Sequence, residues 1–195
     1  GVACFPPSSI PINDTPVFNT NCVPMDTFSI NNTLEIVFAA NKYSSLTEFS
    51  TDVDLFKQSL TSTEPFATYY SDGEINFYQL NQSFDTEDLS EINNYVNTNC
   101  DYINGTPTRL TIVLNDDVVV CSQSGTIVQL NPETTLNTTA LSNATIGSVL
   151  SDFCSYTIKL NYLNPPVATI LTSDISTVPG NITFDFQITD EEYPV

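Results

Sequence analysis

The sequence has no histidine and no tryptophan among its 195 residues, and basic residues are almost as scarce. Without histidine, neither a Ser-His-Asp nor a Cys-His catalytic set can form, and histidine-ligated zinc sites are excluded too. A hydrolase that uses only carboxylates is compatible with this composition, but no pair of acids is singled out by its spacing. We therefore expect a protein that binds or assembles, and not an enzyme.

The shortage of basic residues leaves four Lys and Arg against 23 Asp and Glu, a net charge of −19. Such a surface repels phosphate backbones and anionic lipids, so we predict neither nucleic-acid nor membrane partners. The longest apolar run, Ile36 to Ala40, is far shorter than the roughly 20 residues of a spanning helix, so no membrane insertion is expected. The acidity serves solubility or, alternatively, divalent-cation binding.

Five cysteines occur with no Cys-x-x-Cys spacing, which argues against metal knuckles and thioredoxin-like chemistry and fits disulfides formed in an oxidising compartment. We favour a Cys4–Cys22 bridge, because both residues lie in one proline-rich arm. Cys100–Cys121, which brackets a predicted strand, is the next choice. Cys154 is then either a buried free thiol or an intermolecular link.

N-glycosylation sequons support secretion. The chain begins at Gly1, so either a signal peptide has been removed or the sequence is an excerpt of a longer protein. We expect N-linked glycans, no other cofactor, and an extracellular or cell-surface location. The seven sequons are at Asn13, Asn31, Asn81, Asn104, Asn137, Asn143 and Asn181.

Three regions follow from the distribution of proline and of apolar periodicity. Residues 1–32 form a proline-rich arm, 33–163 an α/β core domain, and 164–195 a C-terminal β extension that follows Asn164-Pro165-Pro166. In the core, buried-type strands alternate with amphipathic helices, which predicts a mainly parallel sheet flanked by helices. The expected strands are 34–40, a pair within 66–80 broken by a turn at 71–73, 110–114, 118–121 and 156–162. The expected helices begin at the capping box Thr51–Asp54, at Asp85 and at Leu141.

Residues 33–121 resemble the von Willebrand factor A domain in the order of these elements. The stretches that carry the resemblance are Leu34–Ser45, Leu55–Leu60, Thr68–Leu80, Glu87–Val96 and Leu110–Asp117. The resemblance implies a protein-binding domain of α/β fold. Its Asp-x-Ser-x-Ser metal loop falls on Asn41, Tyr43 and Ser45, so two of three ligand positions are changed. Ser45, Thr106 and Asp116 remain as degenerate candidates, and we predict no metal.

Near the C-terminus, apolar residues alternate with polar ones, which predicts a half-buried strand over 181–189. A lone strand cannot bury its apolar face, so it must pack on its own domain, on a following domain or on a neighbouring subunit. The neighbour option is β-augmentation, which builds filaments when contacts run head to tail. The candidate assembly residues are Ile182, Phe184, Phe186 and Ile188.

We therefore expect a non-enzymatic secreted glycoprotein that is a structural or adhesive subunit of an extracellular assembly or filament. Its partners would be copies of itself, in a homopolymer or surface assembly joined through the terminal segments. The alternative is a monomeric lectin-like module that binds glycans or another ligand and could depend on Ca²⁺. Its nine tyrosines could stack on sugar rings in place of tryptophan.

Overall fold

The computed structural model describes residues 20–26, 29, 32–100, 108–159, 167–170 and 186–189. The chain divides into two compact units between Ile158 and Lys159, and each unit is described by itself. The predicted boundary at Asn164–Pro166 lies outside the described residues, as does most of the predicted N-terminal arm.

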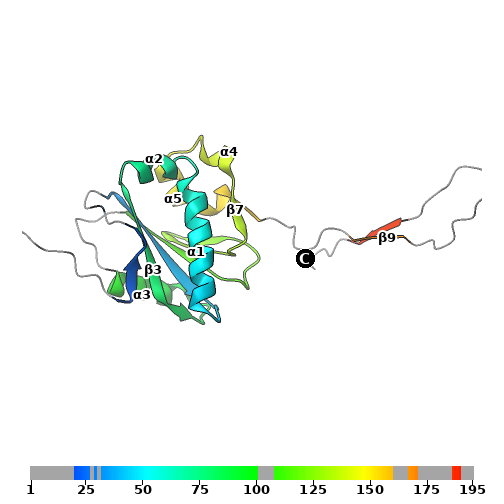
Figure 1. The fold of residues 1–195 in the computed structure, drawn as a ribbon, viewed down its shortest axis with the longest axis horizontal. Helices are drawn as coiled ribbons and strands as arrows, with labels where there is room; N and C mark the ends of the chain where they lie inside the picture. Colours follow the sequence, from blue (N-terminus) through cyan, green and yellow to red (C-terminus); the bar gives the residue numbers. More distant parts are fainter. Residues whose placement is uncertain are drawn as a thin grey trace, which may run out of the picture. The chain divides into compact units, whose positions relative to one another are not determined.

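A six-stranded sheet forms the centre of the first unit, with strand order β1-β3-β2-β4-β6-β5 (Figure 1). The inner strands β3, β2, β4 and β6 run parallel, while β1 and β5 lie antiparallel at the two edges. The prediction of an α/β fold with a mainly parallel sheet is thereby confirmed. The strands are β1 Cys22–Pro24, β2 Leu34–Asn41, β3 Ile75–Phe84, β4 Thr108–Leu114, β5 Ser122–Ser124 and β6 Ile127–Leu130.

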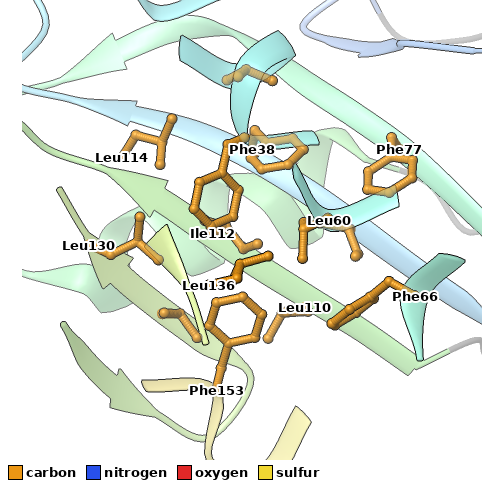
Figure 2. Packing of buried hydrophobic residues seen from close by; sticks show 14 of the residues in the cluster. Phe38, Leu60, Phe66, Phe77, Leu110, Ile112, Leu114, Leu130, Leu136 and Phe153 are labelled. Atoms are coloured by element: carbon orange, nitrogen blue, oxygen red, sulfur yellow. The ribbon is translucent and has the colours of Figure 1, made fainter. Parts of the chain in front are cut away.

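Two long helices cover opposite faces of this sheet. The apolar stripe of α1, Leu46–Thr61, packs with Phe38, Phe66 and Phe153 in the larger core cluster, part of which Figure 2 shows. The stripe of α3, Leu89–Asn99, packs on the other face against alternate residues of β2 and β3 and against Val113 of β4. Because β2 faces a helix on both sides, all eight of its residues are buried, which explains its nearly continuous apolar run.

The remaining described elements of this part of the chain are short. The helices α4 and α5 lie on the same side of the sheet as α1, and Leu141, Val149 and Phe153 join the larger core cluster. These elements are α2 Phe66–Ser71, β7 Thr134–Leu136, α4 Thr138–Leu141, α5 Ile146–Ser151, the 3₁₀-helix Phe153–Tyr156 and β8 Thr157–Lys159, with β7 paired to β8.

The start of α1 differs from the prediction. The helix begins at Leu46, and Ser45 caps it by accepting hydrogen bonds from the backbone N–H groups of Thr47 and Glu48. Thr51, the predicted cap, lies inside the helix and donates its hydroxyl to the Thr47 carbonyl. The predicted apolar stripe of Val53, Phe56 and Leu60 is buried, as expected.

Residues 66–71 form helix α2, although a strand was predicted there. Of this helix only Phe66 is buried, and the Glu64 carboxylate accepts a hydrogen bond from the Thr68 backbone N–H in its first turn. This local contact outweighs the strand propensity of the neighbouring tyrosines. The predicted turn is present, with Gly73 at φ 72°, and β3 follows it.

Two later predictions are also corrected. Residues 118–121 form a loop, and extended structure resumes only at β5, which is joined to β6 by a turn with Gly125 at φ 59°. The helix predicted from Leu141 to Phe153 is broken into shorter pieces, because Asn137 and Thr145 each cap a separate short helix.

In the second unit, β9 Val167–Ile170 pairs antiparallel with β10 Phe186–Thr189. The last four residues of the predicted strand 181–189 are thus confirmed as extended, while Ile182 and Phe184 lie outside the described residues. The register places Phe186 opposite Ile170 and Ile188 opposite Ala168. The strand that pairs with β10 therefore belongs to the same chain, and contact with a neighbouring subunit stays a prediction.

Candidate functional site at the carboxyl ends of the strands

The chain reverses its direction across the sheet at β2. It passes from β2 through α1 to β3 on one side, then through α3 on the opposite face to β4 on the other side of β2. In open α/β sheets, ligands bind beyond the carboxyl ends of the strands at such a switch point. A shallow pocket of about 510 Å³ lies there, lined by Lys42, Tyr43, Ser44, Ser83, Phe84, Asp85 and Asp117.

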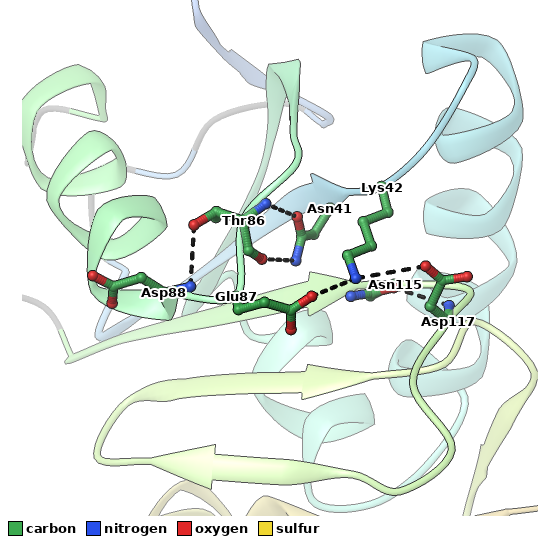
Figure 3. A network of polar contacts seen from close by, with 7 residues as sticks. All are labelled: Asn41, Lys42, Thr86, Glu87, Asp88, Asn115 and Asp117. Carbon is green, nitrogen blue, oxygen red and sulfur yellow. Dashed lines mark hydrogen bonds and ion pairs between the residues drawn. The ribbon is translucent and has the colours of Figure 1, made fainter.

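Lys42 holds this edge together from the end of β2. Its Nζ lies 2.5 Å from Glu87 Oε1 and 3.6 Å from Asp117 Oδ2, so one ammonium joins the segment before α3 to the loop after β4 (Figure 3). Its backbone N–H also donates to the Phe84 carbonyl. The hydrogen bond to Glu87 raises the pKa of Lys42, so the group stays charged. Lys42 adopts φ 64°, a left-handed conformation that is rare outside glycine and asparagine.

Asn41 fixes the same edge from inside. Its Nδ2 donates to the Thr86 carbonyl at 2.8 Å, and its Oδ1 accepts from the Thr86 backbone N–H at 3.2 Å (Figure 3). The side chain is fully buried. Only an amide can donate and accept at once here, because a carboxylate has no proton to give to the carbonyl. Asn41 therefore acts as a structural lock between β2 and the segment before α3.

Tyr43 and Ser45, the other two loop positions, are also committed to local contacts. The Tyr43 hydroxyl donates to Asp52 at 2.9 Å, and its ring packs edge-on against Phe49 with centroids 5.2 Å apart. Burial, reinforced by Asp52, raises the pKa of Tyr43, so the phenol stays protonated. Ser45 accepts two N–H groups of α1 and has become a helix cap.

The degenerate metal candidates do not come together as a donor set. Ser45 caps α1, Asp116 is exposed on the loop after β4, and Thr106 lies outside the described residues. The Lys42 ammonium also places a positive charge at the switch point. Over the described part of the chain, no three His, Cys, Asp or Glu residues are grouped so that they could hold a metal ion. The residues present do not fit the family's magnesium site.

Residues 115–121, which we term the valine loop, cross the sheet edge from β4 to β5. Asn131, directly after β6, donates its Nδ2 to the carbonyls of Asp116 and Val118 at 2.9 and 3.2 Å. Asn115 is buried, and its Oδ1 accepts from the Asp117 N–H at 2.9 Å. The loop is thus pinned on the end of β6, and sequence reasoning missed it by predicting a strand.

The disulfides differ from the predicted pairs. Cys22 is bonded to Cys100, and Cys121 to Cys154. The predicted Cys4–Cys22 and Cys100–Cys121 bridges are therefore wrong, and so is the free thiol at Cys154; Cys4 itself lies outside the described residues. The predicted pairs were chosen by nearness in sequence, but the fold brings distant cysteines together. β1, which contains Cys22, pairs with β3, and Asn21 beside Cys22 donates a hydrogen bond to Asn99 beside Cys100. Two disulfides are consistent with an extracellular protein.

Three of the seven sequons lie in described segments. Asn81 and Asn143 are exposed, whereas Asn137 is half-buried and caps α4 by accepting the Ala140 N–H at 3.1 Å. Their glycosylation stays a prediction. The sequons at Asn13, Asn31, Asn104 and Asn181 lie outside the described residues.

A buried ion pair lies near the start of β2, and the sequence analysis did not identify it. Arg109 donates through Nε and Nη2 to one Glu35 oxygen at 3.0 and 2.7 Å, and Nη2 also donates to the Cys100 carbonyl at 2.6 Å. Burial raises the pKa of Glu35, while the hydrogen bond from Arg109 opposes that rise. The signal available in the sequence was Glu35, a charged residue within the apolar run of β2, which needs a buried partner.

A comparison with protein-family models, curated proteins and solved structures finds no match to this chain. Within the segments that the structure describes, no helix is long and apolar enough to cross a membrane.

Proposed function

We propose that this chain is a non-enzymatic, extracellular adhesive module related to the von Willebrand A domain, which binds a protein partner at its carboxyl edge without a divalent cation. The resemblance is supported by the central strand β2, which lies between β3 and β4 with α1 and α3 on opposite faces.

The observation that carries the proposal is the Lys42 bridge. A protein that bound its partner through a metal ion would keep open oxygen ligands at the switch point. Here an ammonium meets Glu87 and Asp117 instead, and Asn41, Tyr43 and Ser45 are each engaged in a local bond. The edge is therefore held in one shape by protein groups alone, which suits a preformed protein-binding surface.

The test is a binding screen of the purified, glycosylated protein against arrays of extracellular protein domains and of glycans. Each array is probed once in EDTA and once in millimolar Ca²⁺ and Mg²⁺. The proposal expects saturable binding to a protein that EDTA does not change. Binding to glycans alone, or only with Ca²⁺, would favour the lectin-like alternative and overturn the proposal.

The second unit supports an additional structural role in assembly. An isolated two-stranded hairpin is only marginally stable in water, and β9 and β10 form a two-stranded sheet. The register sets Phe186 and Ile188 against Ile170 and Ala168, so that apolar residue types lie opposite one another. A hairpin of this kind gains stability by packing on a further surface, and a neighbouring copy can supply that surface.

Sedimentation velocity tests this assembly role on the full chain and on a chain that lacks residues 180–195. The assembly role expects the full chain to form oligomers and the shortened chain to remain a folded monomer. Because each copy carries a net charge of −19, added salt should favour the oligomer. A full chain that stays monomeric at high salt would contradict this role while leaving the adhesive role intact.

A further inference from the structure

Two consecutive valines project from the carboxyl edge of the sheet. Val120 is 74% exposed, the largest value for any large hydrophobic side chain among the described residues, and Val119 is 44% exposed. Both belong to the valine loop. Neither packs in the two core clusters, so core stability does not account for them.

The valine loop is tied to neighbouring elements at several points. Asn131 pins two of its carbonyls, Lys42 pairs with Asp117, and Cys121 is bonded to Cys154. Cys154 lies in the 3₁₀-helix, where Gln123 accepts the N–H of Phe153 at 2.5 Å. A surface that is already ordered loses less entropy when it binds, so the bracing favours recognition.

Carboxylates surround the base of this loop. Although Asp116 is exposed as a residue, partial desolvation of its carboxyl raises its pKa, and the negative charges of Asp52, Glu48, Asp117 and Glu133 raise it further. Lys42, the cation at this edge, is already bonded to Glu87 and Asp117. An apolar tip with an anionic rim complements a partner that has apolar side chains flanked by basic ones.

A second copy of this chain does not match that description. Of its four basic residues, Lys42, Lys57 and Arg109 all make ion pairs within the chain, with Glu87, Asp26 and Glu35. Each copy also brings a net charge of −19 to the contact. At this loop, contact between two copies would set carboxylates against carboxylates, which repel, so the occupant here is a different, basic protein.

We infer that the valine loop is a docking site in which Val119 and Val120 pack against apolar side chains of a basic partner protein, while the surrounding carboxylates contact its Lys and Arg side chains. The inference rests on the proposed function, because it specifies the partner chemistry at the same edge. Two aliphatic anchors form a small contact, which is typical of a weak or transient interaction.

The experiment uses the full glycosylated chain and three synthetic fluorescent peptides. One peptide has a central Phe-Leu pair flanked by Lys and Arg, the second replaces Phe-Leu by Ser-Ser, and the third replaces Lys and Arg by Glu. The test variant is Val119→Ser/Val120→Ser. The matched control is Leu55→Ser, which removes a 61% exposed aliphatic side chain from the middle of α1.

Fluorescence polarisation should detect binding of the basic Phe-Leu peptide, and this binding should weaken at higher salt. The acidic peptide should not bind. The double valine variant should weaken this binding by about tenfold or more, and the Ser-Ser peptide should show a similar loss. Leu55→Ser should bind as the unaltered chain does.

Four results would overturn the inference. Equal binding of the Phe-Leu and Ser-Ser peptides would show attraction by charge alone, and equal loss in Leu55→Ser would remove the specificity of the loop. Sedimentation that reveals self-association abolished by the valine variant would make the occupant a second copy. If the array screen finds a protein partner whose binding ignores the valine variant, the inference fails and the proposed function stands.

Discussion

The strand β2 has a charged bridge at each end, and the two bridges lie in opposite environments. Glu35 and Arg109 meet inside the sheet near its start, with side chains only 1% and 5% exposed. Lys42 follows its end and meets Glu87 and Asp117, which are 85% and 69% exposed. Both bridges join segments that are far apart in sequence.

This difference teaches which bridge is structural and which shapes a surface. A buried charge that loses its partner is strongly destabilising, so loss of Glu35 or Arg109 alone should cost the fold more than loss of both. Exposed pairs contribute little to stability and are screened by salt. Lys42 therefore sets the shape and charge of the carboxyl edge of the sheet, while the buried Asn41 carries the structural role.

The largest expected effect is that of breaking the buried bridge. Arg109→Met leaves the Glu35 carboxylate buried without its partner, and we expect a loss of about 3–5 kcal/mol in the free energy of unfolding near neutral pH. Urea unfolding followed by circular dichroism measures it. The double variant Glu35→Gln/Arg109→Met, which removes both charges, should recover much of the loss.

The same variant has a characteristic pH dependence. Burial raises the pKa of Glu35, and loss of Arg109 removes a group that opposes that rise. An acid whose folded pKa lies above its unfolded value favours the folded state at low pH, and this contribution is lost as pH increases through the folded pKa. The deficit of Arg109→Met should therefore shrink in acid, and an equal deficit at acidic and neutral pH would argue against a stranded carboxylate.

An intermediate effect is expected at Asn41, whose side chain binds the backbone of Thr86. Asn41→Asp removes the donor to the Thr86 carbonyl and sets a buried carboxylate against it, so we expect a loss of about 1–3 kcal/mol. Thermal and urea unfolding measure the change. Thr86→Ala keeps the backbone groups that Asn41 binds and should cost much less; if both variants are equally unstable, the amide lock is not the cause.

Removal of the exposed bridge should affect stability far less. Lys42→Ala and Lys42→Gly both delete the ammonium, but only glycine adopts φ 64° without strain. We expect the glycine variant to unfold at the higher temperature of the two, and both to lose part of the salt dependence of the unaltered chain. Scanning calorimetry at low and high salt measures this. An alanine variant that equals or exceeds glycine would contradict the backbone argument.

The smallest effect concerns the carboxylates around the valine loop. Because the pKa of Asp116 is raised, its neutral form is favoured in the fold, and its contribution to stability falls as pH increases. Asp116→Asn should raise the unfolding temperature slightly near neutral pH and leave it unchanged in acid. The rise near neutral pH should be smaller at high salt, because salt screens the repulsion between the carboxylates. Asp54→Asn, which removes an exposed acid of α1 outside this cluster, is the matched control for the loss of one negative charge.

Local patterns in the sequence predicted much of the fold but little of the candidate site at the carboxyl edge of the sheet. The nearly continuous apolar run at 34–40 correctly predicted β2, and the amphipathic pattern after Asp85 correctly predicted the helix α3, because burial on those faces follows from periodicity. The start of α1 was misplaced because two capping signals, at Ser45 and Thr51, compete within one segment.

The site depended on contacts between distant residues, which periodicity does not encode. Substitutions at Asn41 and Tyr43 were visible in the sequence, but the partners Glu87 and Asp117 of Lys42 were not. The three valines 118–120 have strand propensity, yet Asn131 holds their loop across the end of β6, where the structure gives them no strand partner. The cysteine pairs failed for the same reason, since sheet order brings Cys22 to Cys100.

The most direct test of the central claim is whether the carboxyl edge responds to divalent cations. Thermal unfolding of the unaltered chain and of Lys42→Ala is followed in EDTA, in millimolar Mg²⁺ and in millimolar Ca²⁺. Any ligand that binds only the folded state raises the unfolding temperature. The account predicts that each protein gives the same curve in all three conditions. A saturable rise for the unaltered chain that Lys42→Ala alters would show a metal at the switch point and contradict it.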